Sequence, residues 1–321
     1  MSRARSWWPS LTTLALLGSL HARALTLPRE GWVTWEIPSV ASAPNWCCFD
    51  GFNGSPKAGG CDLDSRHHGY GSRAEDDTVS QLRIYARSVD GKLTQLRSYA
   101  PSCKVTSKLP LQDLGLLPVD ESLQWLIGKL QPRSKLTGDL LAAIAVHEGA
   151  PAEEKLVALA KSDPVKETRK DAIFWLGQVR GESGAARVRP FLLSDPDEDV
   201  REHAAFSYSQ SVAIDKGAVL IGQAKADPSA KVRSQAWFWL AQTGAPETES
   251  AIAASLVGEV KRSVRHQAIF ALAQLPKSRN VKALIRVIEE RSLAMEDRKQ
   301  ALFWLGQIDS PEALAYLDKV L

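Results

Sequence analysis

Apolar residues recur through the second half of the chain at the spacing of α-helices, and the whole pattern repeats as a block. Counted from an arginine at position zero, apolar side chains occupy positions plus three, plus four and plus seven, which share one face of a helix. A second apolar stripe follows at plus nineteen and plus twenty-three, on successive turns of another helix. The blocks start 32, 32, 32 and 33 residues apart, at Arg169, Arg201, Arg233, Arg265 and Arg298.

Repetition at this period is typical of stacked supersecondary units. Each block predicts two antiparallel helices that are too small to bury their own apolar faces. Neighbouring blocks must therefore stack to form one continuous core. We predict a mostly α-helical fold in which five helix pairs occupy residues 162–321.

Blocks such as RKDAIFWLGQ from Arg169 and RKQALFWLGQ from Arg298 resemble HEAT repeats, in the short form of phycobilisome-lyase-like proteins. The resemblance covers residues 162–321 and implies a right-handed α-solenoid of HEAT-like helix pairs. No lyase activity follows from it, because no chromophore-attachment residue of that family can be matched in this chain.

The same family places an acidic residue six positions before the arginine. The pairs in the first three units are Asp163 with Arg169, Asp195 with Arg201, and Asp227 with Arg233. The fourth unit has Glu259 at the acidic position and the fifth has Ser292, so we expect the pairing to fade toward the C-terminus. We interpret the series, which continues with Arg265 and Arg298, as a structural ladder from unit to unit. A ligand site is the less favoured interpretation, because a repeated buried arginine requires an acceptor.

Two positions on the first helix of each unit face away from the core and carry the same residue in every unit. Plus five lies about 140° and plus nine about 180° from the arginine around the helix, where polar side chains are expected. Plus five is nevertheless phenylalanine throughout: Phe174, Phe206, Phe238, Phe270 and Phe303. Plus nine is glutamine throughout: Gln178, Gln210, Gln242, Gln274 and Gln307.

This Phe–Gln stripe has two interpretations. Lateral packing between first helices would bury it, with the glutamine amides bonded along the stack. An exposed stripe of rings and amides would instead dock an extended peptide or another domain. Packing is slightly favoured, with Phe238 partly buried and Gln242 more exposed, because a ligand site would vary more between units. Trp175, Trp239 and Trp304 at plus six should pack against small residues of a neighbouring unit.

Residues 1–24 have the features of a secretory signal peptide. A positively charged start precedes the apolar run LTTLALLGSL, and Ala22-Arg23-Ala24 forms a small-residue cleavage site. The mature chain is therefore expected to begin at Leu25. The apolar run is too short to span a bilayer comfortably, and we expect no membrane insertion after cleavage.

Cleavage also changes the charge of the chain. It removes three arginines and no acid, which lowers the formal net charge from +3 to zero. A neutral exported chain lacks the clustered positive charge that nucleic-acid binding requires. We therefore expect a periplasmic or secreted protein that binds no nucleic acid.

Residues 25–108 predict a small β-rich region. GWVTWEIP at residues 31–38 predicts a strand, and residues 80–100 predict a hairpin with its turn at Asp90-Gly91. The segment WEIPSVASAPNWCC resembles the N-terminal region of exported bacterial HEAT-repeat proteins. Residues 109–161 predict a connecting helix, capped by Asp120 or Ser122, and an atypical helix pair that closes the solenoid.

The β-rich region contains the four cysteines of the chain: Cys47, Cys48, Cys61 and Cys103. In an exported chain an even number of cysteines predicts disulfides. A bond between the two adjacent cysteines would be strained, so each should pair with one of the two distant ones, and both arrangements stay open. A metal site with His67 and His68 is the less favoured alternative, because the spacing matches no standard zinc pattern.

The chain contains none of the sequence motifs that mark common catalytic sites. HEAT-like repeats also build deoxyhypusine hydroxylase, whose iron ligands come from repeated His-Glu pairs, but this chain has one such pair, His147-Glu148. We expect no cofactor or metal, and predict a non-enzymatic scaffold or adaptor that binds a protein or peptide outside the cytoplasm. The alternative is an enzyme, or an enzyme's accessory subunit, with its chemistry in the Cys- and His-containing N-terminal region. The oligomeric state stays open.

Overall fold

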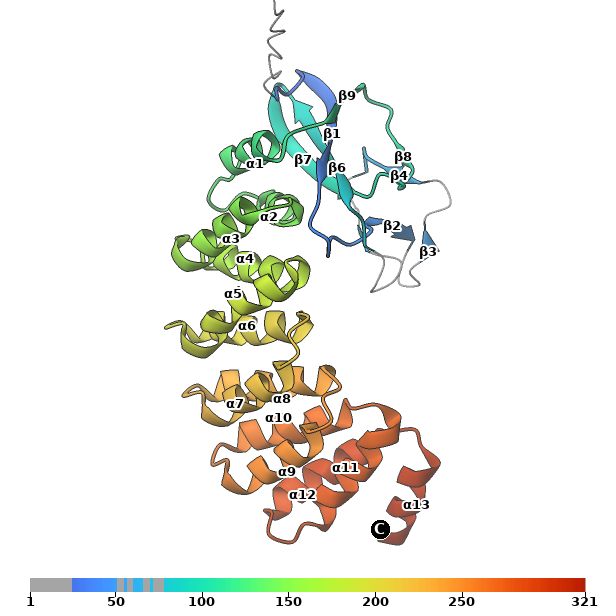
Figure 1. Ribbon diagram of the computed structural model, residues 1–321. Coiled ribbons are helices and arrows are strands. Elements are labelled where there is room, and N and C mark those ends of the chain that lie inside the picture. Colours follow the sequence, from blue (N-terminus) through green and yellow to red (C-terminus); the bar gives the residue numbers. More distant parts are fainter. Residues whose placement is uncertain (1–24, 51–54, 57–59, 66–69, 72–77, 321) are drawn as a thin grey trace, which may run out of the picture.

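The computed structural model describes residues 25–50, 55–56, 60–65, 70–71 and 78–320. A small β-rich domain occupies one end, and a stack of helix pairs extends from it to the C-terminal helix (Figure 1). The fold is mostly α-helical with a cysteine-containing strand region before the helices, as the sequence predicts. The expected signal peptide at residues 1–24 lies outside the described residues.

The β-rich domain is built on a four-stranded sheet with the order β7-β6-β1-β9. β1 (Glu30–Pro38) pairs antiparallel with β6 (Gln81–Val89), and β6 pairs antiparallel with β7 (Lys92–Tyr99). The turn between β6 and β7 has positive φ at both residues, 51° at Asp90 and 72° at Gly91, as a tight two-residue hairpin requires. The predicted strand and hairpin are confirmed.

β9 (Leu111–Leu116) adds a parallel strand to the other edge of β1. The sheet therefore extends into residues 109–161, where the sequence predicted only helices. Leu111 and Leu114 of β9 stand three apart, which interrupts the period-two alternation by which a strand is recognised. The unpaired backbone groups along β1 favour the extended form here, because they require hydrogen-bond partners.

β1 is buried on both sides because each face of the sheet covers a different core. Val33 and Trp35 belong to the core that continues into the helices. Trp32 points the opposite way, into a second cluster with Tyr85, Tyr99 and the cysteines. This assignment follows the alternation of side chains along a strand.

Short strands hold the cysteine region together. They are β2 (Cys47–Asp50), which pairs with β3 (Ser55–Pro56) and β5 (Tyr70–Gly71), and β4 (Cys61–Asp62), which pairs with β8 (Val105–Thr106). Disulfides join Cys47 to Cys103 and Cys48 to Cys61. The structure thus adopts one of the two arrangements that the sequence leaves open, and both bonds lie against the second core cluster.

Three helices connect the sheet to the repeats: α1 (Val119–Gly128), α2 (Thr137–Val146) and α3 (Ala150–Ser162). The first helices of the five units are α4 (Lys166–Val179), α6 (Glu198–Gln210), α8 (Ala230–Gln242), α10 (Arg262–Ala273) and α12 (Met295–Leu305). The second helices are α5 (Gly181–Ser194), α7 (Lys216–Ala226), α9 (Thr248–Gly258), α11 (Lys277–Glu289) and α13 (Pro311–Val320).

Successive first helices pack side by side, and the apolar positions of the blocks form one continuous core. Within the described part of the chain, no helix has the length and apolar character needed to cross a bilayer.

A buried hydrogen-bond chain joins the sheet to the helices. Trp35 Nε1 on β1 donates to Ser122 Oγ on α1 at 2.7 Å. Ser122 Oγ lies 2.8 Å from His147 Nε2, and His147 Nδ1 lies 2.7 Å from the carbonyl of Ala143. A carbonyl only accepts, so the imidazole proton is on Nδ1 and Ser122 donates to Nε2. Ser122 is thus a core residue and caps no helix, and α1 follows Pro118 without a side-chain cap.

Arg180 closes the same junction from the side of the repeats. Its Nη1 donates to the carbonyls of Ala145 and His147, at 3.1 and 2.6 Å, and its Nη2 donates to the carbonyl of Gly149 at 2.7 Å. Its Nε lies 3.6 Å from a carboxylate oxygen of Glu153. The end of a helix leaves carbonyls without intrahelical partners. One guanidinium of the first unit therefore completes the C-terminal end of α2.

Acid should destabilise this junction. Burial lowers the pKa of His147 to about 4, whereas in the unfolded chain it lies at about 6.5. The unfolded chain therefore binds more protons between these values, and the free energy of unfolding should fall as the pH drops from about 7 to about 4. For this group the loss should reach about 3 kcal/mol.

Urea unfolding across that pH range measures the loss, and His147→Gln should make the dependence on pH shallower. An identical slope in the variant and the parent chain would contradict a buried neutral imidazole.

Candidate protein-binding face of the first helices

The arginine at position zero ties each unit to the next. Arg201 on α6 directs Nε and Nη2 to the two carboxylate oxygens of Asp227, at 2.8 and 3.0 Å. Its Nη1 donates to the backbone carbonyl of Asp195 at 2.7 Å. The carboxylate of Asp227 also accepts from Gln223 and from the backbone of Ser229. The arginine thus binds the main chain of the acid six residues before it and the side chain of the next unit's acid.

The same arrangement continues to the fourth unit. Arg233 binds the two carboxylate oxygens of Glu259 at 2.8 and 3.0 Å. Arg265 reaches Asp297 on α12 at 2.7 Å, an acid at a different position of the next unit. The expected fading of the pairing does not occur at Arg265, because Asp297 supplies the carboxylate that the equivalent position lacks.

The two ends of the series differ from its centre. Arg169 makes a longer contact, 3.4 Å from Nη2 to a carboxylate oxygen of Asp197. Asp163 accepts from a backbone N–H two residues further on, in the turn before α4. Arg298 donates from Nε to the carbonyl of Ile288 at 2.7 Å.

The phenylalanines of the Phe–Gln stripe form a row of ring contacts along the first helices. Phe174 stacks on Phe206 with ring centroids 5.8 Å apart and planes 12° apart. Phe238 stacks on Phe270 at 6.0 Å and 3°. Trp239 joins the two stacks, 4.6 Å from Phe206 and 4.8 Å from Phe238. Offset contacts of this kind stabilise aromatic pairs beyond the area that they bury.

The contacts alternate along the row because position plus six alternates between tryptophan and a small residue. A unit with tryptophan places that ring on the phenylalanine of the preceding unit, as Trp304 does on Phe270 at 4.8 Å. In the units with Ser207 or Ala271 at this position, the phenylalanine stacks directly on the phenylalanine of the preceding unit. The tryptophans therefore contact phenylalanines, whereas the expectation was contact with small residues. Gly177 packs tightly on Ser207, since an added Cβ would lie 2.6 Å from the Ser207 carbonyl oxygen.

The rings and the amides of the stripe differ in exposure. Four of the five phenylalanines are half-buried, and Phe303 at the end of the row is 55% exposed. All five glutamines are exposed. The hydrogen bonds between described residues include none that joins two of these glutamines. The rings thus pack laterally while the amides face solvent, and Phe238 and Gln242 have the burial that we expect from the sequence.

The row extends into the β-rich domain through Trp46. Its ring lies 5.7 Å from that of Trp175 on α4. Close by, Ser42 Oγ donates to the carbonyl of Val179 at the end of α4, at 2.6 Å. The sequence pattern does not single out Trp46, because no repeat includes it and the contact joins segments far apart in the chain. The β-rich domain therefore borders the N-terminal end of the stripe (Figure 1).

Position plus two lies on the same face as the stripe and carries mostly uncharged polar groups. Burial lowers the pKa of His203 to about 4, so the ring is neutral at pH 7, and it lies edge-on to Phe206 at 5.8 Å. Burial raises the pKa of Asp171. The last three units have amides at this position: Gln235, Gln267 and Gln300.

The cysteine region is the alternative location for chemistry. Its four cysteines are all in disulfides, so none of them is a free thiolate in this structure. Among the described residues, the group that could hold a metal consists of three of these cysteines, whose sulfurs are already bonded. His67 and His68 lie outside the described residues. Both ring nitrogens of His147 have protein partners, which leaves this imidazole no free lone pair for a metal.

Comparisons with known proteins assign no family to the chain. No protein-family model matches it, and no curated protein sequence matches it. Among solved structures, the chain is similar to human deoxyhypusine hydroxylase in complex with glycerol. The sequence identity is 19% and the TM-score is 0.27, over 62% of this chain and 77% of that one. A likeness at this level transfers no activity.

The first prediction from the site concerns the buried ion pair. Asp227→Ala leaves the Arg201 guanidinium buried without a carboxylate, which should lower the free energy of unfolding by about 3–5 kcal/mol. Glu202→Ala is the matched control on α6, the helix of Arg201, because it removes a partly exposed pair with Lys231 and should cost less than about 1 kcal/mol. Urea denaturation of both variants measures the difference, and equal effects would contradict a structural ladder.

The second prediction separates rings from amides in the central unit. Phe238→Ala removes a half-buried ring that stacks on Phe270, so it should cost about 2 kcal/mol, below the 3–5 kcal/mol of a fully buried ring. Gln242→Ala removes an exposed amide and should change stability by less than about 0.5 kcal/mol. Thermal and urea unfolding check both values. A destabilisation by Gln242→Ala as large as that by Phe238→Ala would mean that the amide is part of the packing.

Proposed function

We propose that this chain is a non-enzymatic scaffold that acts outside the cytoplasm and binds an extended segment of a partner protein along its first helices. The observation that carries the proposal is the row of five exposed glutamine amides beside a row of half-buried aromatic rings. The rings have a role in packing between units. The amides face solvent in every unit and take no part in that ring packing, so they are available to a partner.

The spacing of the glutamines suits an extended polypeptide. Packed helices lie about 8–10 Å apart, and an extended strand rises about 3.3 Å per residue. A segment that runs across the first helices would therefore meet one glutamine about every three residues. Each amide offers a donor and an acceptor, which matches the backbone N–H and C=O of such a segment.

The aromatic row favours the same occupant. Rings that are stacked on one another are already ordered, so a ligand that covers their exposed edges orders few further side chains. Aromatic rings beside hydrogen-bonding groups are common at the centres of protein interfaces. The row runs from Trp46 in the β-rich domain to Phe303 in the last unit, and the proposed binding face therefore extends over all five repeats.

The proposed location rests on the cysteines. Structural disulfides persist in oxidising compartments and are rare in the cytosol, and this chain has two of them. They tie the loops of the β-rich domain to the sheet that supports the N-terminal end of the stripe.

A peptide selected from a random library tests the proposed function. We expect selection by the full chain to yield extended peptides, and their affinity should depend on Gln210, Gln242 and Gln274. A neutral hydrogen bond contributes about 0.5–1.5 kcal/mol. Replacement of the three glutamines by alanine should therefore weaken binding about 100-fold, with little change in thermal stability.

The matched control replaces three exposed lysines on other helices, Lys161, Lys225 and Lys282, by alanine. Fluorescence anisotropy with the labelled peptide gives both affinities. A peptide that loses affinity in the lysine variant and keeps it in the glutamine variant would place the binding face elsewhere and reject the proposal.

A further inference from the structure

Among the residues that the structure describes, the last arginine of the ladder lacks the carboxylate partner that the other four have. Arg169, Arg201, Arg233 and Arg265 each contact a carboxylate of the following unit. Arg298 instead donates from Nε to the carbonyl of Ile288. Among the described residues, neither Nη atom of Arg298 has a hydrogen bond or an ion pair. The charged fork of Arg298 thus has no carboxylate within the part of the chain that the structure describes.

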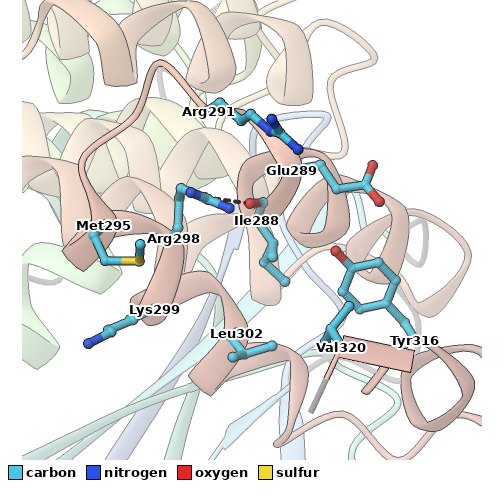
Figure 2. Close-up of a pocket in the computed structure, with 9 residues that line it drawn as sticks. All are labelled: Ile288, Glu289, Arg291, Met295, Arg298, Lys299, Leu302, Tyr316 and Val320. Carbon is cyan, nitrogen blue, oxygen red and sulfur yellow. Dashed lines mark hydrogen bonds between the residues drawn. The ribbon is translucent and has the colours of Figure 1, made fainter. Parts of the chain in front are cut away.

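The Arg298 side chain lies in a pocket at the C-terminal end of the stack. The pocket has a volume of about 500 Å³ and lies between the end of α11, α12 and α13. Figure 2 shows Arg298 beneath the chain that carries Glu289 and Arg291, with Tyr316 and Val320 on the opposite side.

The charge of the pocket favours an anion. Arg291, Arg298 and Lys299 line it against a single acid, Glu289. Glu289 has no ion pair with Arg298 among the described residues. The three cations therefore leave the pocket with a positive excess.

The pocket also has an apolar wall. Leu302 is half-buried, while Met295 is 60% and Val320 45% exposed. Large apolar side chains with this much exposure mark a surface that another group can cover. A ligand that satisfies the pocket therefore combines one negative charge with a neighbouring apolar side chain.

We propose that this pocket binds an aspartate or glutamate side chain of a partner protein, next to an apolar residue, in the role that the next unit's acid has elsewhere in the ladder. The four internal contacts identify the chemistry, because each ladder arginine that has an anion takes a carboxylate. At Arg201 and Arg233 the carboxylate lies against Nε and Nη2. At Arg298 the Ile288 carbonyl occupies Nε, so the carboxylate binds end-on, across Nη1 and Nη2.

This site is separate from the Phe–Gln stripe and does not rest on the proposed function. The aromatic row ends beside it, because Phe303 follows Leu302 on α12. A partner that holds an acid in the pocket could continue along the row, but the carboxylate contact stands without it.

Blocked synthetic peptides test the proposal on the full chain. The probe is the peptide Gly-Leu-Asp-Leu-Gly, with fluorescein on its N-terminal amine and an amidated C-terminus, so that the aspartate is its single carboxylate apart from the label. The same peptide with asparagine is the control, and phosphoserine in place of aspartate gives a second arm. Anisotropy titration should give the aspartate peptide an affinity at least tenfold higher than the asparagine peptide. That preference should decrease as salt is added.

Substitutions assign the binding to the pocket. Arg298→Gln should remove the preference for aspartate, whereas Arg189→Gln, a change on α5 at the other end of the stack, should leave it intact. Arg298 also bonds the main chain, so Arg291→Gln, at an exposed position of the rim, provides a variant that should fold normally and lose affinity at least threefold.

Three results would overturn the proposal. They are equal binding of the aspartate and asparagine peptides, no binding of the aspartate peptide at about 1 mM, and binding of the phosphoserine peptide alone. Loss of the preference in Arg189→Gln as well would also reject the pocket as its location.

Discussion

The structure depends on a buried arginine, Arg201, whose carboxylate partner belongs to the next unit. A repeat of two short helices cannot bury its own apolar faces, and apolar contacts alone tolerate small shifts between neighbours. Arg201 removes that freedom, because a buried charge that loses its partner is strongly destabilising. Its bidentate contact with Asp227, together with the bond to the carbonyl of Asp195, fixes three segments of two units at one place.

The aromatic row follows from that register. Rings on successive first helices come within stacking distance only when the helices keep the same height relative to one another. The alternation of tryptophan with Ser207 and Ala271 then decides which ring spans each gap. Lateral contact uses one side of each phenylalanine, and the glutamine four residues later lies on the same helical face. One stripe can therefore stabilise the stack with its rings and offer its amides to solvent.

The sequence predicts the elements that have a local or repeating pattern. It does not predict contacts that occur once and join segments far apart in the chain. The helix pairs, the strand at residues 31–38 and the hairpin at Asp90-Gly91 all have local patterns, and they are present. β9 has no such pattern, because it forms only where the edge of β1 is available. Serine is a common helix-capping residue, but the hydroxyl of Ser122 is hydrogen-bonded to Trp35 and His147 instead. The carboxylate partner of Arg265 is likewise set by the stack, since Asp297 lies outside the position that the repeat predicts.

The two ends of the solenoid differ in how far their side chains are covered by neighbouring segments. At the N-terminal end, Trp46 of the β-rich domain packs on Trp175, and Arg180 of the first unit completes the C-terminal end of α2. The first unit is therefore joined to the segments that precede it. At the other end, Phe303 is exposed and the fork of Arg298 has no carboxylate among the described residues. Both side chains lie on α12. In the preceding units, the equivalent phenylalanine and arginine contact a ring and a carboxylate of the following unit. A partner that combines an acid with apolar side chains therefore has the chemistry to act as the next unit of the stack.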